Sequence, residues 1–199
     1  MLNCINNFEN FAEIKKQYPK IANWIISDLP YEERIAKLQN SNLFKELTKK
    51  LENDNYTLNE KLSWIDSLNL IYRIFTSEKL NEEIKRDARI IQEYIIPYTK
   101  NNRSDFLIIK DNKILILEFT FQKSKYLIKA QQCFTYKQIL QQFLPNNIEI
   151  ISYVFSYGNE DKNEHVIIET QIEQCVSFLN FFFNSGKAYE ELEKIKVLY

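Results

Sequence analysis

Two acidic residues interrupt segments of the chain that otherwise have the composition of buried strands. Asp105 opens the apolar segment 105–109, and Glu118 lies inside a second one, 114–121. A carboxylate buried without a partner is unfavourable, so each side chain needs hydrogen bonds, a cation or a metal ion. Mg²⁺ binds one or two carboxylates together with water and phosphate oxygens. The pair therefore indicates metal-assisted hydrolysis of a phosphodiester bond.

A third polar group lies on the segment 124–143, which we expect to be a helix. It contains the pattern Q-x-x-x-Y at Gln132 and Tyr136. On a helical projection Lys125, Lys129, Gln132 and Tyr136 form one stripe about 60° wide. Lysines on a face that packs against a sheet need negative charge there, so we predict that the stripe faces the two carboxylates. The apolar residues within or beside this stripe are Ile128, Ile139, Leu140 and Phe143.

In this order, the acidic pair and the Q-x-x-x-Y helix resemble the PD-(D/E)XK nuclease superfamily, and within it the RecB-type group. The resemblance covers about 35 to 40 residues of the chain. It implies that Asp105 and Glu118 bind Mg²⁺ or Mn²⁺, joined by the backbone carbonyl of Phe119. It further implies that Gln132 and Tyr136 hold the active site together and contact nucleic acid.

The sequence departs from the family pattern at the lysine that usually follows the Glu by two residues. Thr120 occupies that place, and threonine cannot supply a positive charge. Either the lysine has migrated to the following helix, or the nuclease chemistry is lost. For a migrated lysine we favour Lys129, which lies one helical turn from the Gln of the motif, then Lys125, then Lys123.

The segment before the first strand offers three more carboxylates. We expect a helix over residues 82–94, with an apolar stripe on one side, ended by Pro97. Glu83 and Asp87 flank the stripe and Glu93 lies opposite, and each is a weak candidate for a further metal ligand. The residues of the stripe are Ile84, Ala88, Ile91 and Ile95.

The remaining elements are expected to position these residues. Upstream, apolar residues recur at helical spacing from Phe8 to Tyr18, before Pro19. Residues 28–30 resemble a helix start with proline in the first turn, and the apolar pattern continues to residue 51. Thr57 and Glu60 fit a capping box at a further helix start. The upstream apolar residues at helical spacing are Phe8, Phe11, Ile14 and Tyr18.

Downstream, residues 110–112 form the turn of a hairpin between the two strands that carry the carboxylates. Strands over 148–155 and 165–170 follow, and then two helices around residues 184–186. This order predicts an α/β fold with a restriction-endonuclease-like small mixed sheet flanked by helices. We divide the chain into an N-terminal helical subdomain, 1–80, and a nuclease-like core with C-terminal helices, 81–199.

Composition narrows the function classes. No run of 18 apolar residues and no secretory signal are present, so we expect a cytoplasmic protein without a membrane partner. Its three cysteines are far apart, and its only histidine, His165, excludes sites that need two imidazoles. The net charge is −1, but residues 100–145 hold eight Lys or Arg and three Asp or Glu. That segment would attract a phosphate backbone.

Two functions remain open for the nuclease-like pattern. One is a metal-dependent nuclease, such as an endonuclease, that cuts DNA or RNA. The other is a catalytically inactive module that binds nucleic acid or a protein partner. A third reading is a helical interaction protein, in which the acidic, Phe-rich C-terminal segment docks a partner. Each residue taken alone also has a structural explanation: Asp105 as a strand start, Glu118 in a salt bridge.

Overall fold

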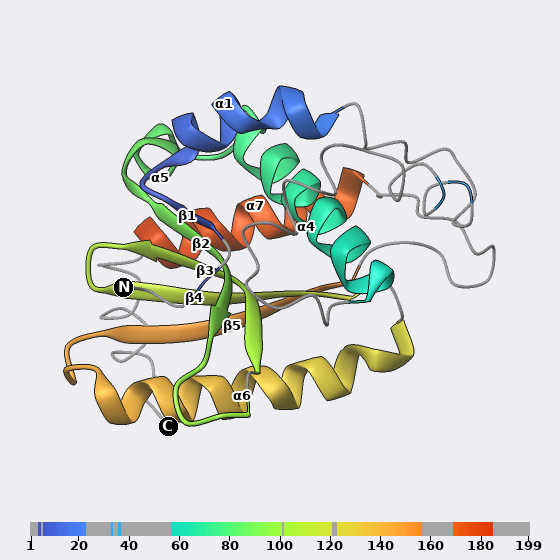
Figure 1. Cartoon of the computed structure of the whole chain (residues 1–199). Helices are drawn as coiled ribbons and strands as arrows, with labels where there is room; N and C mark the ends of the chain where they lie inside the picture. Colours follow the sequence, from blue (N-terminus) through green and yellow to red (C-terminus); the bar gives the residue numbers. More distant parts are fainter. Residues whose placement is uncertain are drawn as a thin grey trace.

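The computed structural model describes residues 4, 6–22, 33, 36, 57–100, 102–120, 123–156 and 169–184. These ranges form one mixed α/β arrangement of a sheet and helices (Figure 1). The elements, in chain order, are β1 (Asn6–Phe8), α1 (Phe11–Ala22), α4 (Leu58–Thr76), α5 (Glu82–Asp87), β2 (Arg89–Ile95), β3 (Arg103–Lys110), β4 (Lys113–Thr120), the 3-10 turn η1 (Lys123–Lys125), α6 (Tyr126–Phe143), β5 (Glu149–Ser156) and α7 (Glu169–Asn184).

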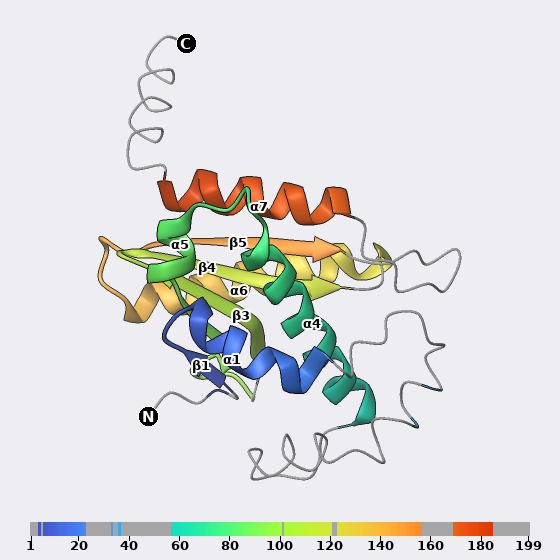
Figure 2. The ribbon, with the colours of Figure 1, turned by 90° about the horizontal axis from the view of Figure 1, so that it is seen from above.

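The five strands make one sheet in the order β1-β2-β3-β4-β5. The first three pairs are antiparallel, and β4 and β5 are parallel. Since parallel neighbours need a crossover, α6 leaves the end of β4 and returns the chain to the start of β5. Helix α6 lies on one face of the sheet, and α1, α4 and α7 lie on the other (Figures 1 and 2). The predicted mixed sheet flanked by helices is confirmed.

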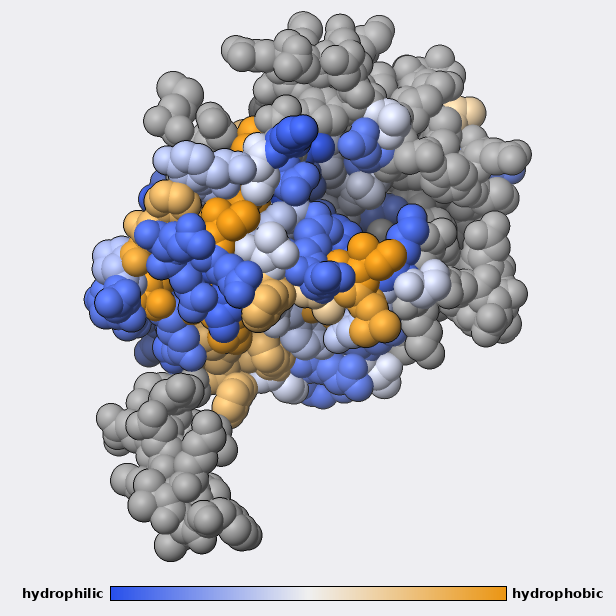
Figure 3. Space-filling model, turned by 90° about the horizontal axis from the view of Figure 1, so that it is seen from below, coloured by the Kyte–Doolittle hydropathy of each residue, from blue (hydrophilic) through white to orange (hydrophobic). Residues whose placement is uncertain are grey.

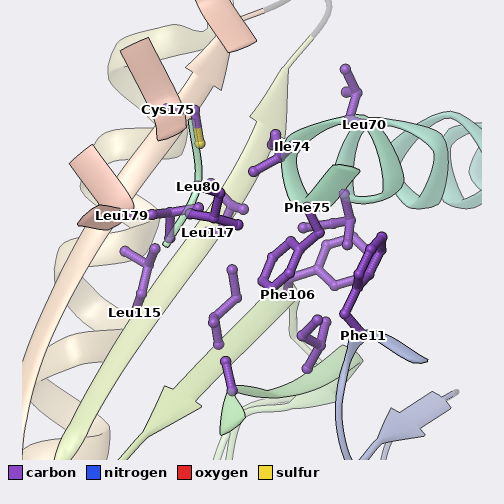
Figure 4. Packing of buried hydrophobic residues seen from close by; sticks show 14 of the residues in the cluster. Phe11, Leu70, Ile74, Phe75, Leu80, Phe106, Leu115, Leu117, Cys175 and Leu179 are labelled. Carbon is purple, nitrogen blue, oxygen red and sulfur yellow. The ribbon is translucent and has the colours of Figure 1, made fainter. Parts of the chain in front are cut away.

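Alternating strand side chains divide the core between the two faces of the sheet. Phe106 and Leu117 point to the side of α1, α4 and α7, where Phe106 packs beside Phe75 and Leu117 lies near Leu80 and Leu179 (Figure 4). Leu107 and Ile116 point to the opposite side, against α6. Full burial of one such side chain contributes about 1.5–3 kcal/mol. The described helices of residues 1–80 share the first cluster with the sheet, while a boundary at residue 80 stays a prediction.

The hairpin and the capping box are confirmed. Strands β3 and β4 are joined by a two-residue turn, in which Asp111 has a positive φ of 55°. Asp is one of the residues that tolerates this conformation. At the start of α4, the Thr57 hydroxyl accepts from the Glu60 amide, and the Glu60 carboxylate accepts from the Thr57 amide. The predicted helix after the hairpin is also present, as η1 and α6.

The predicted helix over 82–94 is wrong beyond residue 87. Helix α5 ends at Asp87, and strand β2 begins at Arg89. Ile90 and Ile91 explain the difference, because both are buried but in the two clusters on opposite faces of the sheet. Consecutive residues reach opposite sides in a strand and not in a helix. Pairing with β1 and β3 therefore decides the structure here.

The N-terminal segment also differs from the helical prediction. Phe8 belongs to strand β1, where it pairs with Ile90 of β2. Helix α1 starts at Phe11 and continues past Pro19 to Ala22, since a proline removes a single backbone donor and need not end a helix. Of the helices expected between residues 30 and 51, the structure describes only residues 33 and 36, both of which are helical.

The C-terminal prediction is only partly covered. The strand expected over 165–170 falls mainly outside the described residues, as does His165. Residues 169 and 170 belong to α7, which runs from Glu169 to Asn184. The described part of the chain contains no helix that is both long and apolar enough to span a membrane.

Candidate active site

The two predicted carboxylates lie where the β3–β4 hairpin opens. Regular pairing of these strands ends at Phe106 and Leu117. At the next position the Asp105 amide donates to Glu118 Oε1 at 3.0 Å, and the Phe119 amide donates to Asp105 Oδ2 at 2.7 Å. Each carboxylate thus accepts a hydrogen bond from the opposite strand's backbone. This exchange fixes both side chains on the face of the sheet that α6 covers.

Lys129 of α6 completes this group. Its ammonium Nζ lies 2.6 Å from Glu118 Oε2 and 3.4 Å from Asp105 Oδ2. The Glu118 side chain is fully buried, whereas the side chains of Asp105 and Lys129 are 21% and 25% exposed. The group is therefore open to solvent on the side of Asp105 and Lys129, and Glu118 forms its floor.

Burial and charge shift the pKa values of these residues in a consistent way. Burial, and after it the charge of Asp105, raise the pKa of Glu118 to about 8 against the opposing effect of Lys129. Burial lowers the pKa of Lys129, but the charges of Asp105 and Glu118 outweigh it and hold that pKa above its ordinary value. The two carboxylates therefore create a strong preference for a cation between them.

Gln132 and Tyr136 form a hydrogen-bonded pair that supports the site through the backbone of β3. The Gln132 amide donates to the Tyr136 hydroxyl, which donates to the backbone carbonyl of Arg103 at 3.2 Å. Tyr136 is buried, and burial raises its pKa to about 12. The pair attaches α6 to the start of β3, two residues before Asp105. The structure thus brings both residues to the site as supports, and contact with nucleic acid stays a prediction.

Glu93 is a further acidic residue near the site. It lies in β2 between Gln92 and Tyr94, which pair with Phe106 and Ser104 on either side of Asp105. Its φ is 54°, in the left-handed region. Its buried carboxylate lies 3.3 Å from the Arg103 Nε. Burial raises the Glu93 pKa well above its usual range, the charge of Asp105 adds to the rise, and Arg103 opposes it. Glu118 and Lys129 also act on Glu93 electrostatically, so Glu93 and these four charged groups belong to one cluster of five.

Arg103 was not among the residues singled out from the sequence. It bridges Glu93 and Glu60, with 3.8 Å to the latter, and its guanidinium lies over the Trp64 ring at 5.5 Å. Its place directly before Ser104 and Asp105 was the only signal. Glu93 could have been placed correctly if residues 89–95 had been interpreted as a strand, because it then shares a face with Ile91.

The other candidates lie elsewhere. Glu83 and Asp87 belong to α5, and Asp87 pairs with Arg86. Helix α5 leads into the end of β2 that pairs with Ile109, which is four residues, or about 13 Å, along β3 from Asp105. The structure therefore does not bring the two weak candidates Glu83 and Asp87 to the carboxylate pair.

The alternative lysines and the residues that follow Glu118 have different positions. Lys125 is an exposed residue at the start of α6, and the side chain of Lys123 lies outside the described residues. Thr120 is buried at the end of β4. Phe119 packs its ring in the core and contributes its amide to the site, while a role for its carbonyl stays a prediction.

The chemistry of the pair fits a hard divalent cation. Asp105 Oδ2 and Glu118 Oε2 converge on one cationic atom, Lys129 Nζ, and carboxylate oxygens are ligands that Mg²⁺ and Mn²⁺ prefer. Within the described residues, no three Asp, Glu, His or Cys side chains are grouped as a metal site. A metal ion here would be held by Asp105 and Glu118, with its other ligands from backbone, water or substrate oxygens.

No protein-family model, curated protein or solved structure matches the chain.

Proposed function

We propose that this protein is a Mg²⁺- or Mn²⁺-dependent nuclease with a restriction-endonuclease-like core, which hydrolyses phosphodiester bonds in DNA or RNA. The observation that carries the proposal is the position of the Lys129 ammonium between Asp105 and Glu118. The element order supports it: an antiparallel β2-β3-β4 unit, a crossover helix and a parallel strand carry the residues that resemble the PD-(D/E)XK pattern.

Lys129 supplies the charge that Thr120 cannot. The superfamily lysine lies on the same strand as the Glu, whereas Lys129 reaches Glu118 from the helix that packs over that strand. Its four-carbon stem is flexible and its ammonium is a compact charge. The charge is therefore retained at the carboxylates although it comes from a different element, which favours the migrated lysine over loss of the chemistry.

Each residue then has a defined role. Asp105 and Glu118 would hold the metal ion, which when bound supplies Lewis-acid chemistry toward a phosphate oxygen and a water molecule. Lys129 stabilises negative charge on the phosphate or orients the water. Gln132 and Tyr136 are positioning residues that keep α6 and β3 in register. The buried floor at Glu118 lowers the local dielectric and so strengthens these interactions.

The charge distribution supports a nucleic-acid substrate. The site lies within residues 100–145, which hold eight basic and three acidic residues, whereas residues 159–199 hold four basic and eight acidic residues. Among the basic side chains near the site, those of Lys100 and Lys125 are exposed. Phosphate contacts to such lysines release counterions, so binding should weaken steeply with salt.

Cleavage of labelled single- and double-stranded DNA and RNA in the presence of Mn²⁺ tests the proposal. We expect cleavage that stops with EDTA and in Glu118→Gln, and that falls on the order of 10²–10³-fold in Lys129→Met. Lys137→Met is the matched control, because it removes a lysine two turns along the same helix. Purified protein that cuts none of these substrates with Mn²⁺ or Mg²⁺ would overturn the nuclease proposal.

The same ion contacts favour one alternative, a catalytically inactive module that binds nucleic acid or a protein partner. In that case Lys129 is a permanent structural counter-ion for Asp105 and Glu118. Calorimetric titration with Mn²⁺ separates the two functions. If neither wild type nor Glu118→Gln gives a heat of Mn²⁺ binding, the inactive module is favoured. If wild type gives this heat and Glu118→Gln does not, the enzyme is favoured.

A further inference from the structure

The outer side of α6 has no charge. The helix contains two charged residues, Lys129 and Lys137, and both are partly buried. In the chain as a whole 27% of residues are charged, so an 18-residue surface helix without exposed charge is unusual for this protein. The exposed residues of α6 are Tyr126, Leu127, Ile128, Gln131, Phe134, Thr135, Gln138, Gln141, Gln142 and Phe143.

Large apolar side chains make up half of this outer α6 face. Leu127 is 78% exposed, Ile128 65% and Phe134 58%. At the end of the helix Phe143 stacks on Tyr98, which is 86% exposed, with 4.8 Å between the ring centroids. Figure 3 views the molecule from the side of α6 and shows hydrophobic atoms spread among hydrophilic ones. Single exposed apolar side chains are common on protein surfaces, so the observation that sets this face apart is that five large ones lie on one helix that exposes no charged residue.

We propose that the outer α6 face binds the same face of a second copy of this chain, in a two-fold symmetric dimer. In such an interface each residue meets residues of the identical patch, so like charges would repel. The outer α6 face carries neither sign of charge, so no such repulsion arises when two copies meet. Glutamine amides both donate and accept hydrogen bonds, so the polar residues of the face can also pair with one another.

Charge also decides against other occupants. A phosphate backbone requires lysines or arginines at the contact. None is exposed between Tyr126 and Phe143, and the nearest exposed lysine is the N-cap residue Lys125. Acidic or basic peptides would likewise find no counter-charge. By contrast, interface cores are depleted in charged residues and enriched in aromatic ones. The helix is about 27 Å long, sufficient for a helix-on-helix contact between two copies, with Tyr98 at the rim.

This dimer is independent of the proposed nuclease activity. The inner side of α6 carries Lys129, Gln132 and Tyr136, and the outer side would carry the dimer contact. Two α6 helices packed back to back would therefore hold two candidate sites facing away from each other, with their solvent-exposed sides free. A failed cleavage assay says nothing about the dimer, and a monomeric protein says nothing about cleavage.

Sedimentation equilibrium from 1 to 100 μM tests the proposal. We expect wild type to have twice its chain mass of 24.0 kDa. Phe134→Glu should weaken the dimer at least about 30-fold, the effect of losing an interface hot spot. Phe181→Glu is the control, because Phe181 is similarly exposed, at 57%, but lies on α7. Wild type that stays monomeric, or a control that dissociates equally, would overturn the dimer.

A charge exchange keeps the test valid if Phe134→Glu does not fold. Gln131 and Gln138 are exposed polar residues about two helical turns apart on the same side of α6, so charged substitutions there should leave the monomer folded. We expect the double variant Gln131→Glu/Gln138→Glu and the double variant Gln131→Lys/Gln138→Lys each to be monomeric. An equimolar mixture of the two should dimerise. A mixture that remains monomeric, with native circular dichroism, contradicts a two-fold α6 contact.

Discussion

The Lys129 ammonium contacts Glu118 Oε2 at 2.6 Å, at the point where a metal ion would neutralise the same carboxylate. The lysine and the metal ion would therefore compete for Glu118 while they cooperate on the phosphate. Removing Lys129 should therefore strengthen metal binding and slow catalysis. A purely structural ion pair would not produce these two opposite effects.

Lys129→Met should bind Mn²⁺ more tightly than wild type, although it cleaves more slowly. Removing the ammonium leaves two carboxylates without a competing cation, and a gain of about 1.4 kcal/mol would lower the Kd tenfold. Isothermal titration calorimetry at pH 8 measures the Kd, with Lys137→Met as the control. A Kd that rises in Lys129→Met would show that the lysine assists metal binding rather than competing with it.

The stability of wild type relative to Glu118→Gln should fall as the pH rises. Because the Glu118 pKa is raised from 4.5 to about 8 in the folded protein, the folded state binds this proton more tightly than the unfolded state. Its stabilising contribution is therefore complete below pH 4.5 and is lost as the pH rises through about 8. The raised pKa of Lys129 acts only above its ordinary value of 10.5, so it does not affect this window. Urea unfolding of both proteins at pH 5 to 9 measures the difference, and a difference that is constant with pH contradicts it.

Tyr136→Phe should weaken the attachment of α6 to β3 and leave the core packed. The substitution keeps the ring but removes the hydroxyl that links Gln132 to the Arg103 carbonyl. Loss of these hydrogen bonds should cost about 1–2 kcal/mol, measured by urea unfolding. Thr135→Val is the matched control on the exposed side of α6, where loss of the hydroxyl bond to Gln131 should change stability by less than about 0.5 kcal/mol. Equal effects of the two substitutions would argue against a supporting role for Tyr136.

Glu93→Gln should weaken Mn²⁺ binding by several-fold, and less than Glu118→Gln. The charges of Glu93 and Asp105 interact, yet Glu93 is paired with Arg103, so we expect its effect on the metal site to be indirect. Glu83→Gln removes an exposed carboxylate of α5, which precedes the far end of β2, and should leave the Kd unchanged. If Glu93→Gln binds Mn²⁺ as tightly as Glu83→Gln does, Glu93 does not belong to the metal site.

Local patterns predicted the hairpin and the helix that bring the site together. Alternating apolar residues and a short Asp-Asn turn are sufficient to define β3 and β4, and helical spacing places Lys129 above them. Strand β2 could not be predicted in this way, because its isoleucines fit a helical stripe equally well. The choice depends on pairing with β1 and β3, which is non-local, and with it the position of Glu93 was missed.

The rotation of α6 about its axis was also only partly predictable. The helix packs on the sheet through Cys133, Tyr136 and Leu140, and Ile128 lies about 110° around the helix from the middle of these three. Ile128 is therefore exposed, although it was expected beside the inner stripe. Phe143 was expected there too, but as the last residue of α6 it extends to the surface, where it stacks on Tyr98.

The exchange of hydrogen bonds between Asp105 and Glu118 also bears on how the hairpin folds. A slip of β4 by one residue against β3 would turn Glu118 to the opposite face of the sheet from Asp105, into the cluster that contains Phe106 and Phe119. There Glu118 would meet neither the Asp105 amide nor Lys129. Misaligned hairpins are thus penalised by the same charges that prepare the site, and a sequence selected for these charges is also selected for correct strand alignment.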